Sequence, residues 1–336
     1  MITSKLKLID EQTSPLFRIM WVYNFDNPAR RQFDNNICAF HIGNGLILSV
    51  AHNLRVEAGI FHTIDDEIYQ REILPCFSQA QSAAFDHLYP LDTATNRRYA
   101  NIPNPQDKMN IINTLKQINF DTRWISFNQK KICKPYLIVQ FKKDHFFNDA
   151  GLDDLFDART YFNEASLYRN TYLIELELTD AFYSEDVALY RIVNTEPKII
   201  SKLPFIEPDF SILDDDESNL YCLQSDPTAS LGRLLNNAHI EGILDHWGVF
   251  NDRIGGNYIF DGYRYLIKGY FRFGSSGAPY VVYDDNEKQF KVNAVQSEAS
   301  PLQLSINNNR EGNFQYVNAI ASPLSIVKSK LEGYLG

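Results

Sequence analysis

The feature that most constrains the fold of this chain is a succession of short apolar runs separated by turn residues. Between residues 16 and 50 the apolar runs are 16–25, 37–42 and 46–50, and the turn segments between them are 26–28 and 43–45. Runs of this length, separated in this way, are typical of β-hairpins. The N-terminal part of the chain is therefore predicted to be β-structure.

The same rhythm continues through the rest of the chain. Many short strands with regular turns indicate an antiparallel barrel or sandwich. The further predicted strands are 136–141, 172–178, 187–193, 258–260, 263–270, 280–283, 292–295 and 316–320.

Three segments depart from the β pattern. Residues 79–131 contain, at 107–119, apolar residues at helical spacing, and 144–169 is also expected to be partly helical. A C-terminal helix is predicted over 322–333, with Ser322 as cap, Pro323 in the first turn and Gly333 as the stop. We find no internal repeat of the solenoid or propeller kind.

Composition excludes several classes of protein. Hydrophobic residues make up 44% and charged residues 22% of the 336, an ordinary globular composition long enough for about two domains. The 32 basic and 42 acidic residues give a net charge of -10. This charge provides no basis for sequence-independent binding to nucleic acid or to an anionic membrane.

No secretory leader or membrane span is evident at the start of the sequence or later. The four cysteines are far apart and form no CxxC pair, which argues against a zinc site and a disulfide scaffold. The acidic run 214–217 is interpreted as a solvated loop rather than a calcium site. We therefore expect a cytoplasmic protein with no cofactor and no metal.

Two residues at strand ends are candidates for acid–base chemistry. His52 ends the run 43–52, so a strand would hold it rigidly, as a general base requires; the other six histidines have no such context. Asp186 begins the apolar run 187–193. Such an acid commonly caps a strand, and alternatively it orients a histidine and stabilises the imidazolium.

A third candidate is the segment GSSGAP at 274–279. Its GxSGxP pattern arises by chance in about one such sequence in two hundred. One interpretation is a simple turn between two strands. In the other, Ser276 presents its hydroxyl, and the backbone N–H groups of Gly274 and Ser276 converge on one oxyanion.

The segments LILSVAHN, DVALYRIV and GSSGAP, in the order His, Asp, Ser, resemble the signature segments of trypsin-like serine peptidases with the chymotrypsin fold. The resemblance covers about 14–75 and 132–333. Asn53 stands where many secreted members have a cysteine, and Ser275 where zymogen-type members have an aspartate. The chain is therefore more similar to the bacterial glutamyl-endopeptidase-like and HtrA-like branches.

The resemblance implies a mainly β fold of two antiparallel six-stranded barrels, over 14–200 and 201–321, followed by the C-terminal helix. It implies that His52 is the general base, Asp186 its orienting partner and Ser276 the nucleophile, with Gly274 and Ser276 forming the oxyanion hole. The specificity pocket would be formed by Tyr270, Ser297, Glu298, Ala299 and Tyr316, with Asn318 nearby. No Asp stands at the pocket base, although Glu298 would still favour a basic substrate residue.

His52 and Asp186 are far more widely separated than is usual in this family, which implies an insertion of about eighty residues, placed at about 79–131 with 144–169 as a further candidate part. It either gates the cleft and selects partners or merely packs on the first barrel. Two functions stay open. One is a cytoplasmic serine endopeptidase of restricted specificity, activated by a partner, that cleaves proteins or peptides. The other is a catalytically latent or vestigial member that acts as a protein-interaction module.

Overall fold

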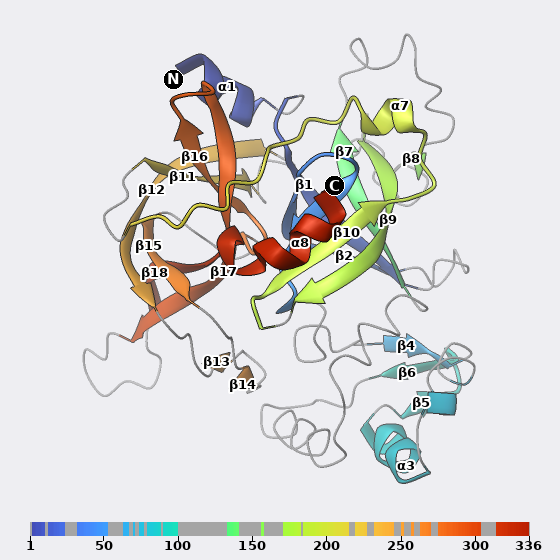
Figure 1. Ribbon diagram of the computed structural model, residues 1–336. Helices are drawn as coiled ribbons and strands as arrows, with labels where there is room; N and C mark the ends of the chain where they lie inside the picture. The colour runs from blue at the N-terminus through green and yellow to red at the C-terminus, as the bar shows by residue number, and fades with distance from the viewer. Residues whose placement is uncertain are drawn as a thin grey trace.

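The computed structural model contains two closed six-stranded antiparallel β-barrels with few helices, the arrangement of a chymotrypsin-like fold (Figure 1). This confirms the fold class expected from the sequence. The structure describes residues 2–10, 13–23, 32–52, 63–66, 70, 74–76, 79–88, 90–99, 133–140, 156–157, 171–182, 184–214, 219–226, 232–244, 250–251, 257–258, 263–269, 275–303 and 314–335.

The first barrel is a ring in the order β1, β2, β3, β10, β9, β7, closed by the pairing of β7 with β1. Because every strand in a closed ring has two neighbours, the barrel has no open edge. A strand of two residues, β8 (Phe156–Asp157), pairs with β9 outside the ring. The ring strands are β1 (Leu16–Tyr23), β2 (Gln32–His41), β3 (Leu46–Ser49), β7 (Cys133–Gln140), β9 (Thr171–Phe182) and β10 (Val187–Ile192).

The second barrel closes in the order β11, β12, β15, β18, β17, β16. Its first two strands were not anticipated from the sequence, and β12 is interrupted by a register shift between Ile240 and Gly242. The short pair β13 (Phe250–Asn251) and β14 (Asn257–Tyr258) lies outside the ring. The ring strands are β11 (Leu220–Asp226), β12 (Gly232–Leu244), β15 (Arg264–Gly269), β16 (Pro279–Asp284), β17 (Gln289–Gln303) and β18 (Phe314–Pro323).

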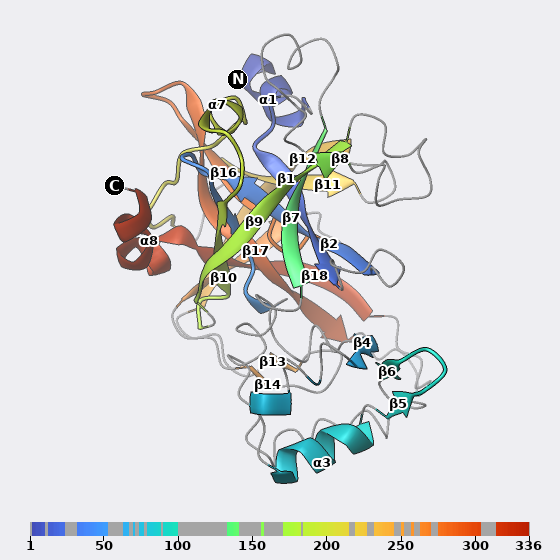
Figure 2. The same cartoon turned by 90° about the vertical axis from the view of Figure 1, so that its right-hand side faces the viewer.

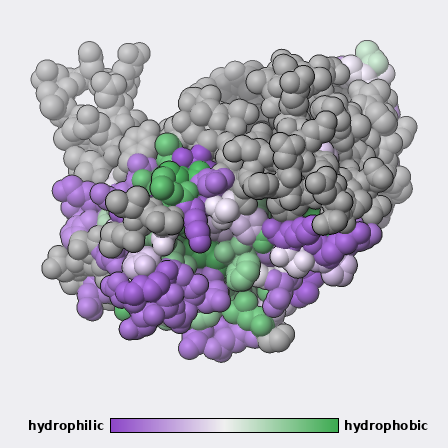
Figure 3. Space-filling view, turned by 90° about the horizontal axis from the view of Figure 1, so that it is seen from above, coloured by the Kyte–Doolittle hydropathy of each residue, from purple (hydrophilic) through white to green (hydrophobic). Residues whose placement is uncertain are grey.

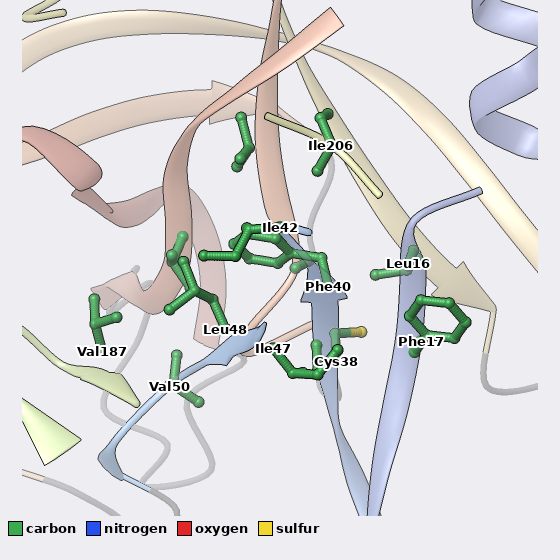
Figure 4. Packing of buried hydrophobic residues seen from close by; sticks show 14 of the residues in the cluster. Leu16, Phe17, Cys38, Phe40, Ile42, Ile47, Leu48, Val50, Val187 and Ile206 are labelled. Atoms are coloured by element: carbon green, nitrogen blue, oxygen red, sulfur yellow. The ribbon is translucent and has the colours of Figure 1, made fainter. Parts of the chain in front are cut away.

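Both barrels share one hydrophobic core. A single cluster of buried residues extends from Leu16 in β1 to Leu331 near the C-terminus. Phe40, Leu48 and Val187 lie in the part of this core that Figure 4 shows from close by. Strand β3 is buried along its whole length, which explains why three of its four residues, Leu46 to Leu48, form an apolar run in the sequence.

A linker joins the two barrels and is hydrogen-bonded to both. It contains α7 (Pro197–Ile200), and the N–H of Ile206 donates to His41 O at 2.9 Å. Further along, the N–H of Asp209 donates to Val292 O at 2.7 Å. The linker also exposes Phe205 and Ile212. Apolar side chains reach the surface among hydrophilic ones on the face seen in Figure 3.

Helices flank the barrels at both ends of the chain. The N-terminal helix α1 (Ile2–Ile9) packs against β12, and a 3-10 turn (Leu324–Val327) leads into α8 (Lys328–Leu335). The expected start at Ser322 is wrong, because Ser322 and Pro323 still pair with β17. Gly333 lies inside α8 and does not stop it. Among the residues described, no helix is long and apolar enough to span a membrane.

Part of the predicted insertion, together with residues 63–66 and 74–76 that precede it, forms a small unit at the opposite end of the molecule from α1 (Figures 1 and 2). Arg98 joins its elements, donating from Nε to Asp66 Oδ1 at 2.5 Å and from Nη1 to Asp86 Oδ1 at 2.8 Å. The helix expected at 107–119 lies outside the described residues, as does most of 144–169. The elements are β4 (Thr63–Asp65), a 3-10 turn (Leu74–Cys76), α3 (Gln79–Leu88), β5 (Leu91–Asp92) and β6 (Arg97–Tyr99).

His41 is a buried structural histidine that attaches the linker to the turn after β2. The N–H of Gly45 donates to its Nε2 at 3.1 Å, so Nδ1 carries the proton and faces Pro204 O at 3.1 Å. This arrangement needs the neutral imidazole. Burial lowers the pKa of His41 below its ordinary value of 6.5, although hydrogen bonds to backbone carbonyls oppose the shift.

We predict that His41 makes the stability of the protein depend on pH. Below pH 6.5 His41 binds a proton in the unfolded state but remains neutral in the folded state, so the free energy of unfolding falls as pH falls. His41→Gln removes this titration and should flatten the decrease between pH 6.5 and 5. Urea unfolding of the wild type and of His41→Gln at several pH values measures how the free energy of unfolding depends on pH. Equal slopes for the two proteins would contradict the assignment.

Candidate active site

Strand register brings His52 and Asp186 together, although 134 positions separate them in the chain. In the antiparallel pair of β3 and β10, Ser49 lies opposite Ala188. Continuing that register by two residues places Asp186 opposite Ala51, beside His52. The Nδ1 atom of His52 lies 2.8 Å from Asp186 Oδ2.

The Asp186 carboxylate is fully buried and accepts four hydrogen bonds. Its Oδ1 accepts the N–H of Ala51 at 3.1 Å and the N–H of His52 at 2.7 Å. Its Oδ2 accepts His52 Nδ1 and the hydroxyl of Ser297. A buried carboxylate stays ionised only when donors compensate its lost hydration, and these four donors do so.

Asp186 has φ = +57°, a left-handed conformation for a residue with a side chain. Such a backbone costs on the order of 1 to 3 kcal/mol and persists only where surrounding contacts impose it. Here the hydrogen bonds from Ala51 and His52 impose it. Asp186 therefore caps the end of β3, and through the same carboxylate it binds the histidine ring.

The contact with Asp186 fixes which nitrogen of His52 holds the proton. An ionised carboxylate only accepts, so Nδ1 is the protonated nitrogen, and Nε2 is the basic one. The side chain of His52 is 21% exposed, whereas that of Asp186 is fully buried. This is the arrangement of a histidine that is oriented from behind and exchanges a proton at its accessible face.

Ser276 lies in a tight turn immediately before β16. The N–H of Ala278 donates to Ser275 O at 2.8 Å and closes this turn. Gly277, the third residue of the turn, has φ = +84°, the value that a type II turn has at this position. The turn thus places Ser276 at a half-buried corner of the second barrel.

The Ser276 turn is hydrogen-bonded to both barrels. The N–H of Cys38 in β2 donates to Ser276 O at 2.8 Å, at a position where β2 has no pairing with β3. On the other side, the N–H of Gly277 donates to Gln296 O at 2.8 Å. Since Gln296 precedes Ser297, which binds Asp186, strand β17 connects the Ser276 turn to the segment that carries Asp186.

Ser297 makes a contact that was not predicted: its hydroxyl donates to the Asp186 carboxylate. Its expected place in a wall of the specificity pocket stays a prediction. A register shift in β17 between Gln296 and Glu298 accompanies this orientation. Glu298, expected in the same wall, is buried, and its backbone O accepts Gln296 Nε2 at 2.5 Å.

The second barrel places a polar network behind this site. The hydroxyl of Tyr280 donates to Gln296 Oε1, and burial raises the pKa of Tyr280, so this phenol stays protonated. Burial also raises the pKa of the neighbouring Cys222 thiol to about 12, which makes it unreactive at neutral pH. Cys222 and Cys38 are free thiols.

The other predicted site residues are only partly placed. Gly274, of the expected oxyanion hole, and Tyr270, of the expected pocket base, lie outside the described residues. Ala299 pairs with Ala319, and Tyr316 pairs with Pro301, in the β17–β18 ladder. Within the described part of the chain, no group of three or more His, Cys, Asp or Glu side chains could hold a metal ion.

Two residues that make contacts at this site, Gln296 and Ser297, were not predicted to make them. Both residues follow the predicted strand 292–295; Ser297 was expected only in the pocket wall, and Gln296 carries no motif of its own. The one available signal is the polar run 296–298 directly after a mainly apolar strand, because polar residues in a buried strand need partners.

Comparisons with known proteins were made for the whole chain. No protein-family model matches it, and no curated protein sequence matches it. Among solved structures, the chain is similar to the active form of the Rv3671c protease from M. tuberculosis, at 10% identity and TM-score 0.43, over 97% of this chain and 85% of that one.

Two further solved structures have comparable values. Deg5 has 10% identity and TM-score 0.42, over 98% of this chain and 92% of that one. The HtrA-type protease AlgW with a decapeptide has 9% identity and TM-score 0.45, over 99% of this chain and 67% of that one. All three TM-scores are below 0.5, so the chemistry of this chain is argued only from its own residues.

We predict that Gly277→Ala destabilises the protein by about 2 to 5 kcal/mol, the sum of a left-handed backbone and an overpacked site. A Cβ at this position would lie 2.0 Å from Cys38 O and 2.6 Å from Ser49 Oγ. Urea unfolding measures the change.

The matched control for this substitution is Gly333→Ala in α8. Nothing lies within 4 Å of a Cβ built there, and alanine favours a helix, so stability should be unchanged or slightly higher. Similar losses in both variants would contradict the predicted role of the close approach at Gly277.

Proposed function

We propose that this protein is a serine endopeptidase, with Ser276 as nucleophile, His52 as general base and Asp186 as the orienting acid. The observation that carries the proposal is the fully buried Asp186 carboxylate, 2.8 Å from Nδ1 of the part-exposed His52. A buried carboxylate bound to Nδ1 orients the imidazole and stabilises its protonated form, which a general base acting through Nε2 requires.

In this mechanism, His52 Nε2 removes the hydroxyl proton as Ser276 Oγ bonds to the carbonyl carbon of a peptide. The imidazolium then gives that proton to the leaving amine as the C–N bond breaks, and an acyl-enzyme remains. Water attacks the ester in the second half, losing a proton to His52, which returns it to Ser276. The charge on the imidazolium is stabilised by the Asp186 carboxylate.

The oxyanion formed in each half requires preorganised donors. The N–H groups of Ser276 and Gly274 are the proposed donors, and such groups are each worth roughly 2.7 to 4 kcal/mol in acyl transfer. The hydrogen bonds of the turn to Cys38 and Gln296 support this role, because they fix the peptide that carries the Ser276 side chain.

The substrates proposed are proteins or peptides, bound beside β17. Whether Glu298 and Tyr270 select the residue at the cleavage site stays a prediction, as do the cytoplasmic location, the restricted specificity and a regulatory partner bound by the insertion. The absence of nucleic-acid and membrane binding is likewise a prediction from the net charge of -10.

We expect a fluorophosphonate probe to add once to the wild-type protein, observed by intact-mass spectrometry. Ser276→Ala should show no adduct, because the attacking oxygen is gone. Ser201→Ala is the control, since it removes an exposed serine of the linker, and its adduct should remain. Folded wild-type protein without an adduct would contradict the proposal and favour the latent interaction module.

We expect Asp186→Asn to lower the labelling rate by about 10⁴-fold, the effect of the corresponding change in a serine protease triad. An amide presents a donor where the carboxylate accepts, so the His52 ring takes the wrong tautomer. Time courses of labelling for the wild type and the variant give the ratio. A ratio near one would exclude the proposed part of Asp186 in the mechanism.

A further inference from the structure

The turn that carries Asp186 is anchored from outside its own barrel. This turn, residues 184–186, joins β9 to β10. Two cations from other parts of the fold bind it: Arg264 from β15 of the second barrel, and Lys330 from α8. Figure 1 shows the end of the β9–β10 hairpin reaching toward the second barrel, beside α8.

Arg264 is fully buried, the largest of the fully buried side chains. Its Nη2 donates to Ser184 O at 2.6 Å, and its Nη1 donates to Tyr263 O at 3.0 Å. Removing a guanidinium from water is unfavourable unless its donors find acceptors in a fixed geometry. Its planar fork suits this task, since it binds two carbonyls at once.

The Lys330 contact is of a different kind. Its Nζ lies 2.5 Å from Glu185 Oε1 and 5.2 Å from the centre of the Phe182 ring, but the lysine side chain is 43% exposed. Exposed ion pairs contribute little to geometry because water competes for both charges. Of the two cations, Arg264 is therefore the one that fixes the path of the turn.

The hydrogen bond from Arg264 to Ser184 O matters because Ser184 lies close to Asp186 in the chain. Two residues later, Asp186 adopts the unfavourable φ of +57° that aims its carboxylate at His52. The carboxylate is held at its tip by the first barrel and by Ser297. Arg264 holds the preceding backbone, so the turn is fixed at both ends.

We propose that Arg264 is a positioning residue for the Asp186–His52 pair. By fixing Ser184 O it holds the turn in the conformation that keeps Asp186 against His52 Nδ1. The inference rests on the proposed function for its catalytic consequence, but not for the geometry. The competing explanation is that Arg264 only ties the two barrels together.

The test compares Arg264→Met with Lys268→Met. Lys268 lies on the same strand with a side chain 68% exposed, so the control removes a cation without touching the turn. Two quantities are measured on the full-length proteins: the fluorophosphonate labelling rate, and the downfield proton NMR signal of His52 Nδ1–H. Cooperative thermal unfolding shows that each variant is folded.

For Arg264→Met we expect labelling to be about 10²-fold slower, the size of effect that a displacement of 1 Å has on a catalytic group. The His52 Nδ1–H signal should broaden or disappear, because its exchange with water is faster when Asp186 moves away. Lys268→Met should leave both quantities unchanged. A purely structural role would lower thermal stability and leave the signal in place.

A folded Arg264→Met with wild-type labelling and signal would overturn the proposal, as would equal losses in Lys268→Met. If Arg264→Met does not fold, Arg264→Lys replaces it. Its single ammonium cannot reproduce the fork, so labelling should fall by about tenfold, and unchanged values would again overturn the proposal. A wild-type protein with the His52 signal but no labelling would contradict the proposed function. The positioning role would then be judged from the signal alone, by whether Arg264→Met loses it and Lys268→Met keeps it.

Discussion

The buried carboxylate of Asp186 is the interaction on which the rest of the site depends. It accepts hydrogen bonds from Ala51 and His52, which follow β3, and from Ser297 in β17 of the other barrel. Without all of them a charge in this place would be too costly to bury. The strand register, the left-handed backbone and the bulge in β17 all bring donors to this one group.

The two barrels are joined by more than the site. One hydrophobic cluster continues through both, the linker bonds to both, and Cys38 of the first barrel bonds to the Ser276 turn of the second. Relative motion of the barrels would break these contacts together. The site is therefore located where the fold is most constrained, which suits side chains that must be held to a fraction of an ångström.

Much of this could be predicted from the sequence, because strands such as 46–50 and 187–193 are mainly apolar and the three motifs lie at strand ends. Strands β11 and β12 were missed, since β12 mixes Asn, His and Glu with its apolar residues and is bulged at Gly242. The partner of Ser297 could not be predicted, because a bulge decides which way its hydroxyl points. Nothing in the sequence near Arg264 indicates that it reaches Ser184, as that contact forms between barrels.

Each terminal helix covers the barrel that is farther along the chain from it. Helix α1 packs on β12 with Lys5 over the Tyr221 ring, and α8 reaches back to Glu185 and Asp180 of the β9–β10 hairpin. Chains emerge from the ribosome N-terminus first, so the hairpin with Asp186 is made long before Arg264 and Lys330 arrive. The native surroundings of Asp186 are therefore complete only after the second barrel and α8 have been made, and a nascent chain that still lacks them cannot hold its charged pair in the finished geometry.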